Sequence, residues 1–408
     1  MKAVVFKGVG NIALEDVPNP QIKDPEDAII RITATSICGT DLHMVRGTMP
    51  GMEKGTILGH EAIGIVEECG PEVKNFKPGD RVIVCSTIAC GQCVFCLAEE
   101  YSSCDRANPN GPEAGTPFFG GPKLSGPFDG LQAERARIPF ADTVLVDLPE
   151  TISDEDGLLC SDIFPTGFMA AEICDVRKGD YVAVFGCGPV GQMAIASAKL
   201  LGAKQVFAID VIPDRLARAA EQGAVIINYD EENPVKRLKE LTNGFGPDGV
   251  IDAVGVDAQQ PHAGPAKGNA VKDAMNIVEQ KTVAPWAVLF GGQWRQGDAP
   301  SQVLQWCVES VRKSGVIAIA GVYPQTAKFF PIGMAMQKGL TTRAANCSHR
   351  KYIPRLLQII EEGRFRPSQV LSVSSDMGDV ITCYKNFDRR ELGWLKVELL
   401  PGQSRQAA

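Results

Sequence analysis

The spacing of hydrophobic and polar residues divides the chain into two kinds of sequence. Residues 1 to about 160 carry short apolar or alternating runs between Gly and Pro breaks, which predict strands over 28–34, 62–67 and 81–84. From about residue 165, apolar runs instead alternate with stretches of helical spacing. The predicted strands of this second part are 181–185, 205–210, 224–228, 249–253 and 315–320. Strands that alternate with helices are typical of a parallel sheet.

The end of the chain returns to the strand-rich pattern. A helix is predicted near 353–363 and a last strand near 394–400. We therefore predict an α/β protein with a doubly wound parallel sheet over 163–339. A second, β-rich domain is predicted over 1–162 and 340–408.

Composition narrows the class of protein and its partners. The 408 residues are 44% hydrophobic and 22% charged, which is typical of a globular protein with two cores. A net charge of −8 argues against nucleic acid or an anionic membrane as a partner, and no apolar run has the length of a membrane span. The first residues, Met1 to Lys7, are too mixed for a signal peptide and are expected to form a strand. Thirteen cysteines then favour metal binding over disulfides, so a reducing cytoplasm is expected.

A glycine-rich turn follows the strand 181–185. Gly186 allows the turn, Gly188 lets backbone amides approach a pyrophosphate, and Gly191 lets the following helix pack against the strand. Pro189 and Val190 begin that helix, whose N-terminus favours phosphate groups. The pattern predicts a Rossmann dinucleotide site, with an ordinary strand–helix turn as the alternative.

An acidic residue ends the next predicted strand. Asp210 lies nineteen residues after Gly191, where a carboxylate accepts hydrogen bonds from the adenosine ribose and repels a 2′-phosphate. NAD is therefore expected rather than NADP. Arg215 is predicted to cover the adenine or ribose, with a solvated surface position as the alternative.

Four cysteines cluster within residues 85–110. Cys90, Cys93, Cys96 and Cys104 have the spacing C-x2-C-x2-C-x7-C. Four thiolates complete a closed tetrahedral zinc site that leaves no position for substrate. We predict a structural zinc, with an iron–sulfur cluster as the alternative.

A second constellation lies upstream, in the motifs C-G-T-D-x-H from Cys38 to His43 and G-H-E from Gly59 to Glu61. With the four-cysteine lobe and the glycine turn, these motifs resemble the zinc-dependent medium-chain alcohol dehydrogenases over essentially the whole chain. The resemblance implies a GroES-like catalytic domain, with Cys38 and His60 as ligands of a catalytic zinc.

The third ligand of that zinc is implied by its distance from a Thr-Gly pair. Counting back from Thr166, the register selects Asp162, and Cys160 is the alternative. Glu61 is expected to support the site or to alternate as a ligand. Three protein ligands leave a fourth position for the substrate oxygen.

The ligand set Cys, His and Asp resembles the glutathione-independent formaldehyde dehydrogenases, which implies NAD chemistry on small alcohols or hydrated aldehydes. The resemblance also implies that Thr40 begins a proton relay and that His43 continues it; a surface imidazole is the alternative for His43. Asp41 is expected to cap the following helix.

A long excursion, residues 256–301, interrupts the parallel-sheet domain. The similar subgroup has an insert here that wraps the adenine end of NAD, which makes His262 a candidate cofactor contact. NAD trapped in this way would permit aldehyde dismutation, whereas a subunit contact or a solvent loop is the alternative.

The leading function is thus a zinc-dependent dehydrogenase with two zinc ions and NAD. The alternatives are an aldehyde dismutase with tightly bound NAD and a non-catalytic zinc protein on the same scaffold. The resemblance also implies a homotetramer acting on a small-molecule substrate.

Overall fold

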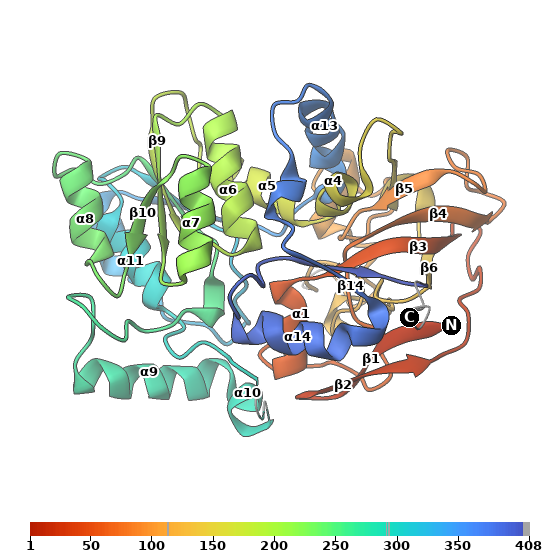
Figure 1. The fold of residues 1–408 in the computed structure, drawn as a ribbon, viewed down its shortest axis with the longest axis horizontal. Coiled ribbons are helices and arrows are strands. Elements are labelled where there is room, and N and C mark those ends of the chain that lie inside the picture. Colours follow the sequence, from red (N-terminus) through yellow and green to blue (C-terminus); the bar gives the residue numbers. More distant parts are fainter. Residues whose placement is uncertain (112–113, 291, 293, 403–408) are drawn as a thin grey trace, which may run out of the picture. The chain divides into compact units, whose positions relative to one another are not determined.

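The computed structural model describes residues 1–111, 114–290, 292 and 294–402, which form two compact units (Figure 1). The first unit comprises the described residues of Met1–Pro165, of Phe290–Trp294 and from Asn346 onward. The second comprises Thr166–Leu289 and Arg295–Ala345. Within the described residues, no helix has both the length and the apolar character needed to cross a membrane.

The second unit is built on a six-stranded parallel sheet of order β10-β9-β8-β11-β12-β13. Its strands in chain order are β8 (Tyr181–Phe185), β9 (Gln205–Asp210), β10 (Val225–Asn228), β11 (Gly249–Asp252), β12 (Val316–Ile319) and β13 (Thr341–Ala344). The strand order reverses between β8 and β11, which is the switch point of a doubly wound sheet. The predicted fold class and the strands expected from the apolar runs are confirmed.

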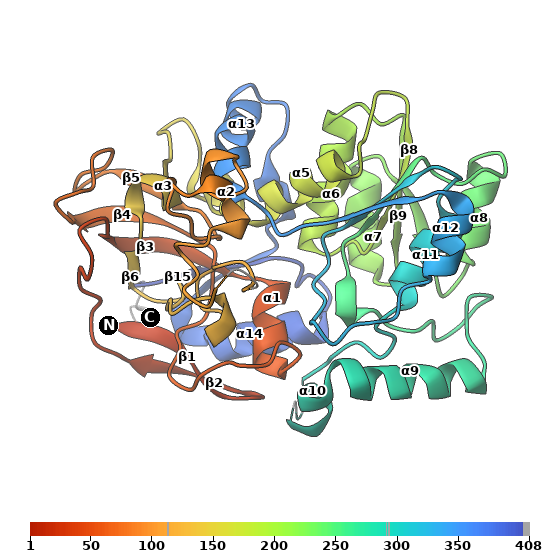
Figure 2. The ribbon, with the colours of Figure 1, turned by 180° about the vertical axis from the view of Figure 1, so that it is seen from behind.

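Helices cover both faces of this sheet (Figures 1 and 2). One face packs against α5 (Ile163–Ile173), α6 (Pro189–Leu200) and α7 (Pro213–Glu221), and the other against α8 (Pro234–Leu241), α11 (Gln302–Ser310) and α12 (Ile332–Lys338). Small residues such as Ala194 and Ala198 let α6 approach the strands closely. The inner strands β8, β9 and β11 are therefore mostly buried on both faces, which explains their continuous apolar runs, whereas the edge strand β13 is exposed.

The predicted excursion contains helices of its own. It begins with η3 (Gly255–Asp257) and continues into α9 (Ala270–Val283) and α10 (Pro285–Phe290). Asn269 caps α9, because its side-chain oxygen accepts hydrogen bonds from two backbone amides of the first turn.

The first unit contains a mainly antiparallel sheet of order β14-β15-β3-β4-β5-β7, with β6 also paired to β3. The strands are β3 (Ala28–Ile37), β4 (Ala62–Cys69), β5 (Arg81–Val84), β6 (Arg135–Ile138), β7 (Leu145–Asp147), β14 (Val373–Asp376) and β15 (Val397–Leu400). A hairpin of β1 (Lys2–Gly8) and β2 (Asn11–Asp16) stands beside it. Because β15 pairs antiparallel with the end of β3, the last strand of the chain lies next to the residues that lead into Cys38.

Helices also connect the strands of the first unit. They are α1 (Gly39–Arg46), α2 (Val94–Leu97), α3 (Ala141–Val144), α4 (Asp154–Leu159), α13 (His349–Glu361) and α14 (Val380–Arg389), with 3-10 turns η1 (Tyr101–Ser103), η2 (Lys123–Ser125), η4 (Pro367–Val370) and η5 (Met377–Asp379). The start of α1 follows β3, and the stretch between α4 and α5 carries Asp162.

Candidate functional site

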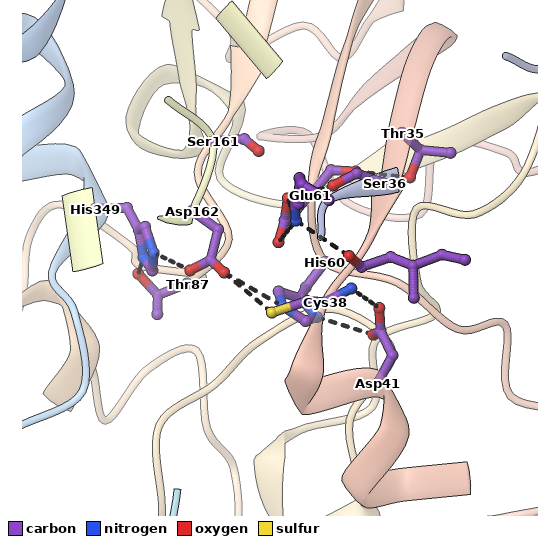
Figure 3. A network of polar contacts seen from close by, with 12 residues as sticks. Thr35, Ser36, Cys38, Asp41, His60, Glu61, Thr87, Ser161, Asp162 and His349 are labelled. Atoms are coloured by element: carbon purple, nitrogen blue, oxygen red, sulfur yellow. Dashed lines mark hydrogen bonds and ion pairs between the residues drawn. The ribbon is translucent and has the colours of Figure 1, made fainter. Parts of the chain in front are cut away.

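Four buried side chains from distant parts of the sequence converge in the first unit. One potential ligand atom from each of Cys38, His60, Glu61 and Asp162 lies within 4.8 Å of the others (Figure 3). Asp162 Oδ2 lies 3.6 Å from Cys38 Sγ and 3.5 Å from His60 Nε2. Cys160 is also buried but is not a member of this cluster.

Burial and neighbouring groups shift the pKa values of the cluster residues. Burial, with the nearby carboxylates Glu61 and Asp162, raises the pKa of the Cys38 thiol to about 11. Burial would also raise the pKa of Asp162, but hydrogen bonds from His349 and His60 hold it well below its ordinary value. A thiol, an imidazole and a carboxylate with a low pKa are ligand types that suit a divalent zinc ion, whose charge would lower the pKa of the thiol.

A carboxylate holds the far side of the His60 ring. Asp41 Oδ1 lies 3.1 Å from His60 Nδ1, which leaves Nε2 on the side of Cys38 and Asp162. Asp41 also accepts a hydrogen bond from the Cys38 backbone amide at 2.9 Å, so it caps α1 as expected. Metal-binding histidines are commonly oriented in this way by a carboxylate on the other ring nitrogen. The prediction for Asp41 was therefore incomplete, since the same carboxylate orients His60.

Glu61 is paired with a lysine from the last strand region. Lys396 Nζ lies 2.7 and 2.6 Å from the two Glu61 carboxylate oxygens, and Ser36 Oγ donates to the same carboxylate. Both Lys396 and Glu61 are fully buried. Burial opposes the charge on Lys396, but Glu61 raises its pKa above the ordinary lysine value. These contacts favour a supporting role for Glu61.

Two residues of the site escaped the sequence analysis. His349 Nε2 lies 2.7 Å from Asp162 Oδ1, and Lys396 reaches Glu61. The sequence signals for these two residues were weak: His349 is one of four histidines in the chain, and Lys396 lies within a largely apolar strand region. Their partners lie 187 and 335 residues away along the chain, beyond the reach of any local pattern.

The expected relay residues lie on α1, directly after Cys38. Thr40 is in the first turn and His43 is three residues on, so both lie on one side of the helix. His43 is only 4% exposed, so the alternative of a surface imidazole is wrong.

The four cysteines of the 85–110 lobe form a second cluster of potential ligands. Their sulfur atoms lie 3.5 Å apart for Cys93 and Cys96, and 3.9 Å apart for Cys90 and Cys96 and for Cys93 and Cys104. All four are free thiols. Backbone amides donate to the sulfurs, as in the contact of Cys90 N with Cys104 Sγ at 3.3 Å. Burial raises the pKa of the Cys93 thiol. Hydrogen bonds from the Cys96 amide and the neighbouring thiols outweigh burial and lower this pKa to about 7. The donor set fits a tetrathiolate metal site.

The glycine turn of the second unit has the predicted geometry. Gly186 has φ +90°, and a Cβ at Gly191 would lie 1.9 Å from the Gly186 carbonyl oxygen. Gly188 is the N-cap of α6, with Pro189 as the first residue of the helix and Val190 next to it. The backbone thus has the tight turn and close helix packing that a pyrophosphate site requires.

Asp210 and Arg215 lie against this turn. Asp210 Oδ2 accepts a hydrogen bond from Cys187 N at 2.7 Å, and its Oδ1 accepts from Val211 N at 2.7 Å. A Cβ at Gly188 would lie 3.5 Å from Arg215 Nη1. His262, by contrast, is exposed, and its backbone amide donates to Asp230 at 2.7 Å.

Family models match both parts of the chain. Residues 24–150 match the alcohol dehydrogenase GroES-like domain, and residues 189–263 match the zinc-binding dehydrogenase model. The fold and the two clusters thus define a two-domain dehydrogenase of the zinc-binding class. The chain belongs to the zinc-dependent medium-chain alcohol dehydrogenase family, as its sequence motifs predicted.

Individual relatives agree with this assignment. The chain is 37% identical to the uncharacterized zinc-type alcohol dehydrogenase-like protein AdhB of Bacillus subtilis, over 98% of this chain and all of that protein. It is 32% identical to the glutathione-independent formaldehyde dehydrogenase of B. subtilis, over 79% of this chain and 75% of that protein. Among solved structures, it is similar to the alcohol dehydrogenase TADH from Thermus sp. ATN1, with TM-score 0.80 and 34% identity, over 98% of this chain and all of that chain.

Proposed function

We propose that this chain transfers a hydride between a primary alcohol or hydrated aldehyde and NAD. The observation that carries the proposal is the buried cluster of Cys38, His60 and Asp162 in a chain of this family, together with a complete dinucleotide turn. Cys38, His60 and Asp162 would hold a catalytic zinc, which supplies a Lewis acid that lowers the pKa of an alcohol oxygen. Cys90, Cys93, Cys96 and Cys104 would hold a second, structural zinc.

The protein's own residues orient the site and handle the proton. Asp41 holds the His60 ring, and Lys396 fixes the Glu61 carboxylate. Thr40 and His43, on one side of α1, would accept and pass on the proton released by the alcohol. The hydride is accepted by the nicotinamide of the cofactor.

The glycine turn and the Asp210 carboxylate would determine which dinucleotide binds. Amides at the N-terminus of α6 would bind the pyrophosphate, and Asp210, already oriented by Cys187 N, would accept the ribose hydroxyls. A 2′-phosphate would meet the Asp210 carboxylate, so NAD is favoured over NADP. Arg215, beside Gly188, would contact the adenosine half.

The assembly and location are proposed on narrower grounds. A homotetramer rests on the family resemblance alone. A cytoplasmic location rests on the thirteen cysteines, all of which are free thiols.

The experiment is an NAD reduction assay with zinc-loaded protein over primary alcohols of increasing chain length. We expect turnover with NAD, far weaker turnover with NADP, and loss of turnover in Cys38→Ser with NAD binding retained. Zinc-loaded protein that binds NAD but oxidises no alcohol, and reduces no aldehyde with NADH, would contradict the proposal and indicate the non-catalytic alternative.

A further inference from the structure

The chain re-enters the first unit through residues 346–350, which we call the return segment. Each of its residues makes a polar contact with that unit. These contacts join Asn346 Nδ2 to Thr116 Oγ1 at 2.7 Å, Cys347 O to Thr87 Oγ1 at 3.2 Å, Ser348 Oγ to Ser102 N at 3.1 Å, His349 Nε2 to Asp162 Oδ1 at 2.7 Å, and Arg350 Nη1 to Leu145 O at 2.7 Å. The segment is therefore fixed along its whole length.

His349 contacts one oxygen of the Asp162 carboxylate, and the candidate metal ligands lie near the other. Oδ1 is bound to the His349 ring, whereas Oδ2 faces Cys38 Sγ and His60 Nε2 (Figure 3). The other ring nitrogen, Nδ1, lies 3.1 Å from Thr87 Oγ1, and the ring is 3% exposed. Contacts on both nitrogens of a buried ring fix its orientation, and with it the carboxylate of Asp162.

The residue before His349 contacts the four-cysteine lobe. Ser348 Oγ accepts a hydrogen bond from Ser102 N and lies 3.2 Å from Ser102 Oγ. Ser102 belongs to η1, which leads directly into Cys104. A continuous set of contacts thus runs from the lobe through Ser348 and His349 to Asp162.

We propose that His349 is a positioning residue for the Asp162 ligand, and that the four-cysteine lobe, through Ser102 and Ser348, holds His349 in place. The two metal sites are then energetically linked: a formed lobe strengthens metal binding at the catalytic cluster. This inference rests on the proposed zinc at Cys38, His60 and Asp162. Residues that orient a metal ligand typically change metal affinity by about 10- to 100-fold.

The test is the zinc dissociation constant of the catalytic cluster, measured by chelator competition. Cys38→Ser, which should retain only the lobe ion, identifies which of the two ions is titrated. We expect His349→Leu to weaken the catalytic site by about 10- to 100-fold. His349→Gln, whose amide can still donate to Asp162, should give an intermediate affinity. Ser348→Ala should weaken the site by about 3- to 10-fold.

Asn346→Ala is the matched control, because Asn346 lies in the same segment but contacts Thr116. Its zinc affinity should equal that of the wild type. Thermal unfolding of each metal-free variant checks the fold, and the visible spectrum of the cobalt-substituted protein reports the ligand geometry directly. A merely structural His349 would lower the unfolding temperature but leave the zinc affinity and the cobalt spectrum of the folded protein unchanged.

Two results would overturn the inference. One is catalytic-site affinity in His349→Leu within twofold of the wild type, and the other is an equal loss in Asn346→Ala. If the wild-type cluster binds no zinc at all, the proposed function itself fails, which is a different outcome from either of these.

Discussion

Lys396 and Glu61 form an ion pair at 2.6 Å in which both side chains are fully buried. Breaking a buried pair leaves one charge in the interior without compensation, which costs about 3–5 kcal/mol of stability. Lys396→Met should therefore lower the free energy of unfolding by that amount in urea titrations. In the double variant Lys396→Met with Glu61→Gln, the loss should be smaller than the sum of the two single losses.

An exposed pair of the same length is the control. Lys2 and Asp16 also lie 2.6 Å apart, but their side chains are 51% and 77% exposed. Lys2→Met should change the unfolding free energy little, because water and salt screen exposed charges. Equal losses in Lys2→Met and Lys396→Met would show that burial does not set the strength of these pairs.

Gly191 and Gly188 should respond differently to the same change. A Cβ at Gly191 would lie 1.9 Å from the Gly186 carbonyl oxygen, so Gly191→Ala should cost about 1–3 kcal/mol of stability.

A Cβ at Gly188 has its nearest neighbour at 3.5 Å, so Gly188→Ala should cost less than about 1 kcal/mol. It should still weaken NAD binding at least tenfold, because the methyl group would occupy the place where the backbone approaches the pyrophosphate. Denaturation and NAD fluorescence titration measure the two effects separately, and equal NAD affinity in Gly188→Ala and wild type would refute the role given to this turn.

Asp210→Asn should reduce the preference for NAD. The change removes the charge that repels a 2′-phosphate and replaces one oxygen that accepts from a backbone amide. We expect the ratio of kcat/KM for NAD to that for NADP to fall at least tenfold. Asp214→Asn, a charge-removing change at the start of α7, is the control and should keep the wild-type ratio. An unchanged ratio in Asp210→Asn would remove Asp210 from cofactor selection.

Much of the site followed from sequence because its motifs are local. Cys38 with His43, His60 with Glu61, and the glycine turn are each contained within a few residues, so family spacing locates them. Asp162 required only a count back from Thr166. The strands of the parallel sheet were equally accessible, since strands buried on both faces form continuous apolar runs.

The remainder depends on contacts that no local pattern encodes. His349 and Lys396 reach the cluster only because the chain returns to the first unit after the parallel sheet, and because β15 pairs with β3. Asp41 was found as a cap because a cap is a three-residue pattern. Its contact with His60 depends instead on how β4 lies against β3.

Buried thiols should make the protein less stable at alkaline pH. Burial raises the pKa of Cys85 to about 12 from an ordinary value of 9.0. The folded state therefore keeps a proton that the unfolded chain releases above pH 9, so this stability is complete below pH 9 and is lost as pH rises toward 12. Each such thiol should contribute a loss of roughly 1.4 kcal/mol per pH unit in that window.

The pH dependence of the unfolding free energy in a cysteine variant shows whether that thiol causes the loss of stability. In unfolding titrations between pH 8 and 10, Cys85→Ala should show a shallower fall in stability than the wild type, whatever its stability at pH 8. A slope equal to that of the wild type would mean that Cys85 does not titrate differently in the folded and unfolded states.

The most direct test of the account is the zinc content per chain of the purified protein. We predict two zinc ions in the wild type and in Cys160→Ala, and one in Cys38→Ser and in Asp162→Ala, where the four-cysteine site should remain filled. Two ions in Asp162→Ala, or one in Cys160→Ala, would contradict the assignment of Cys38, His60 and Asp162 as the catalytic metal site.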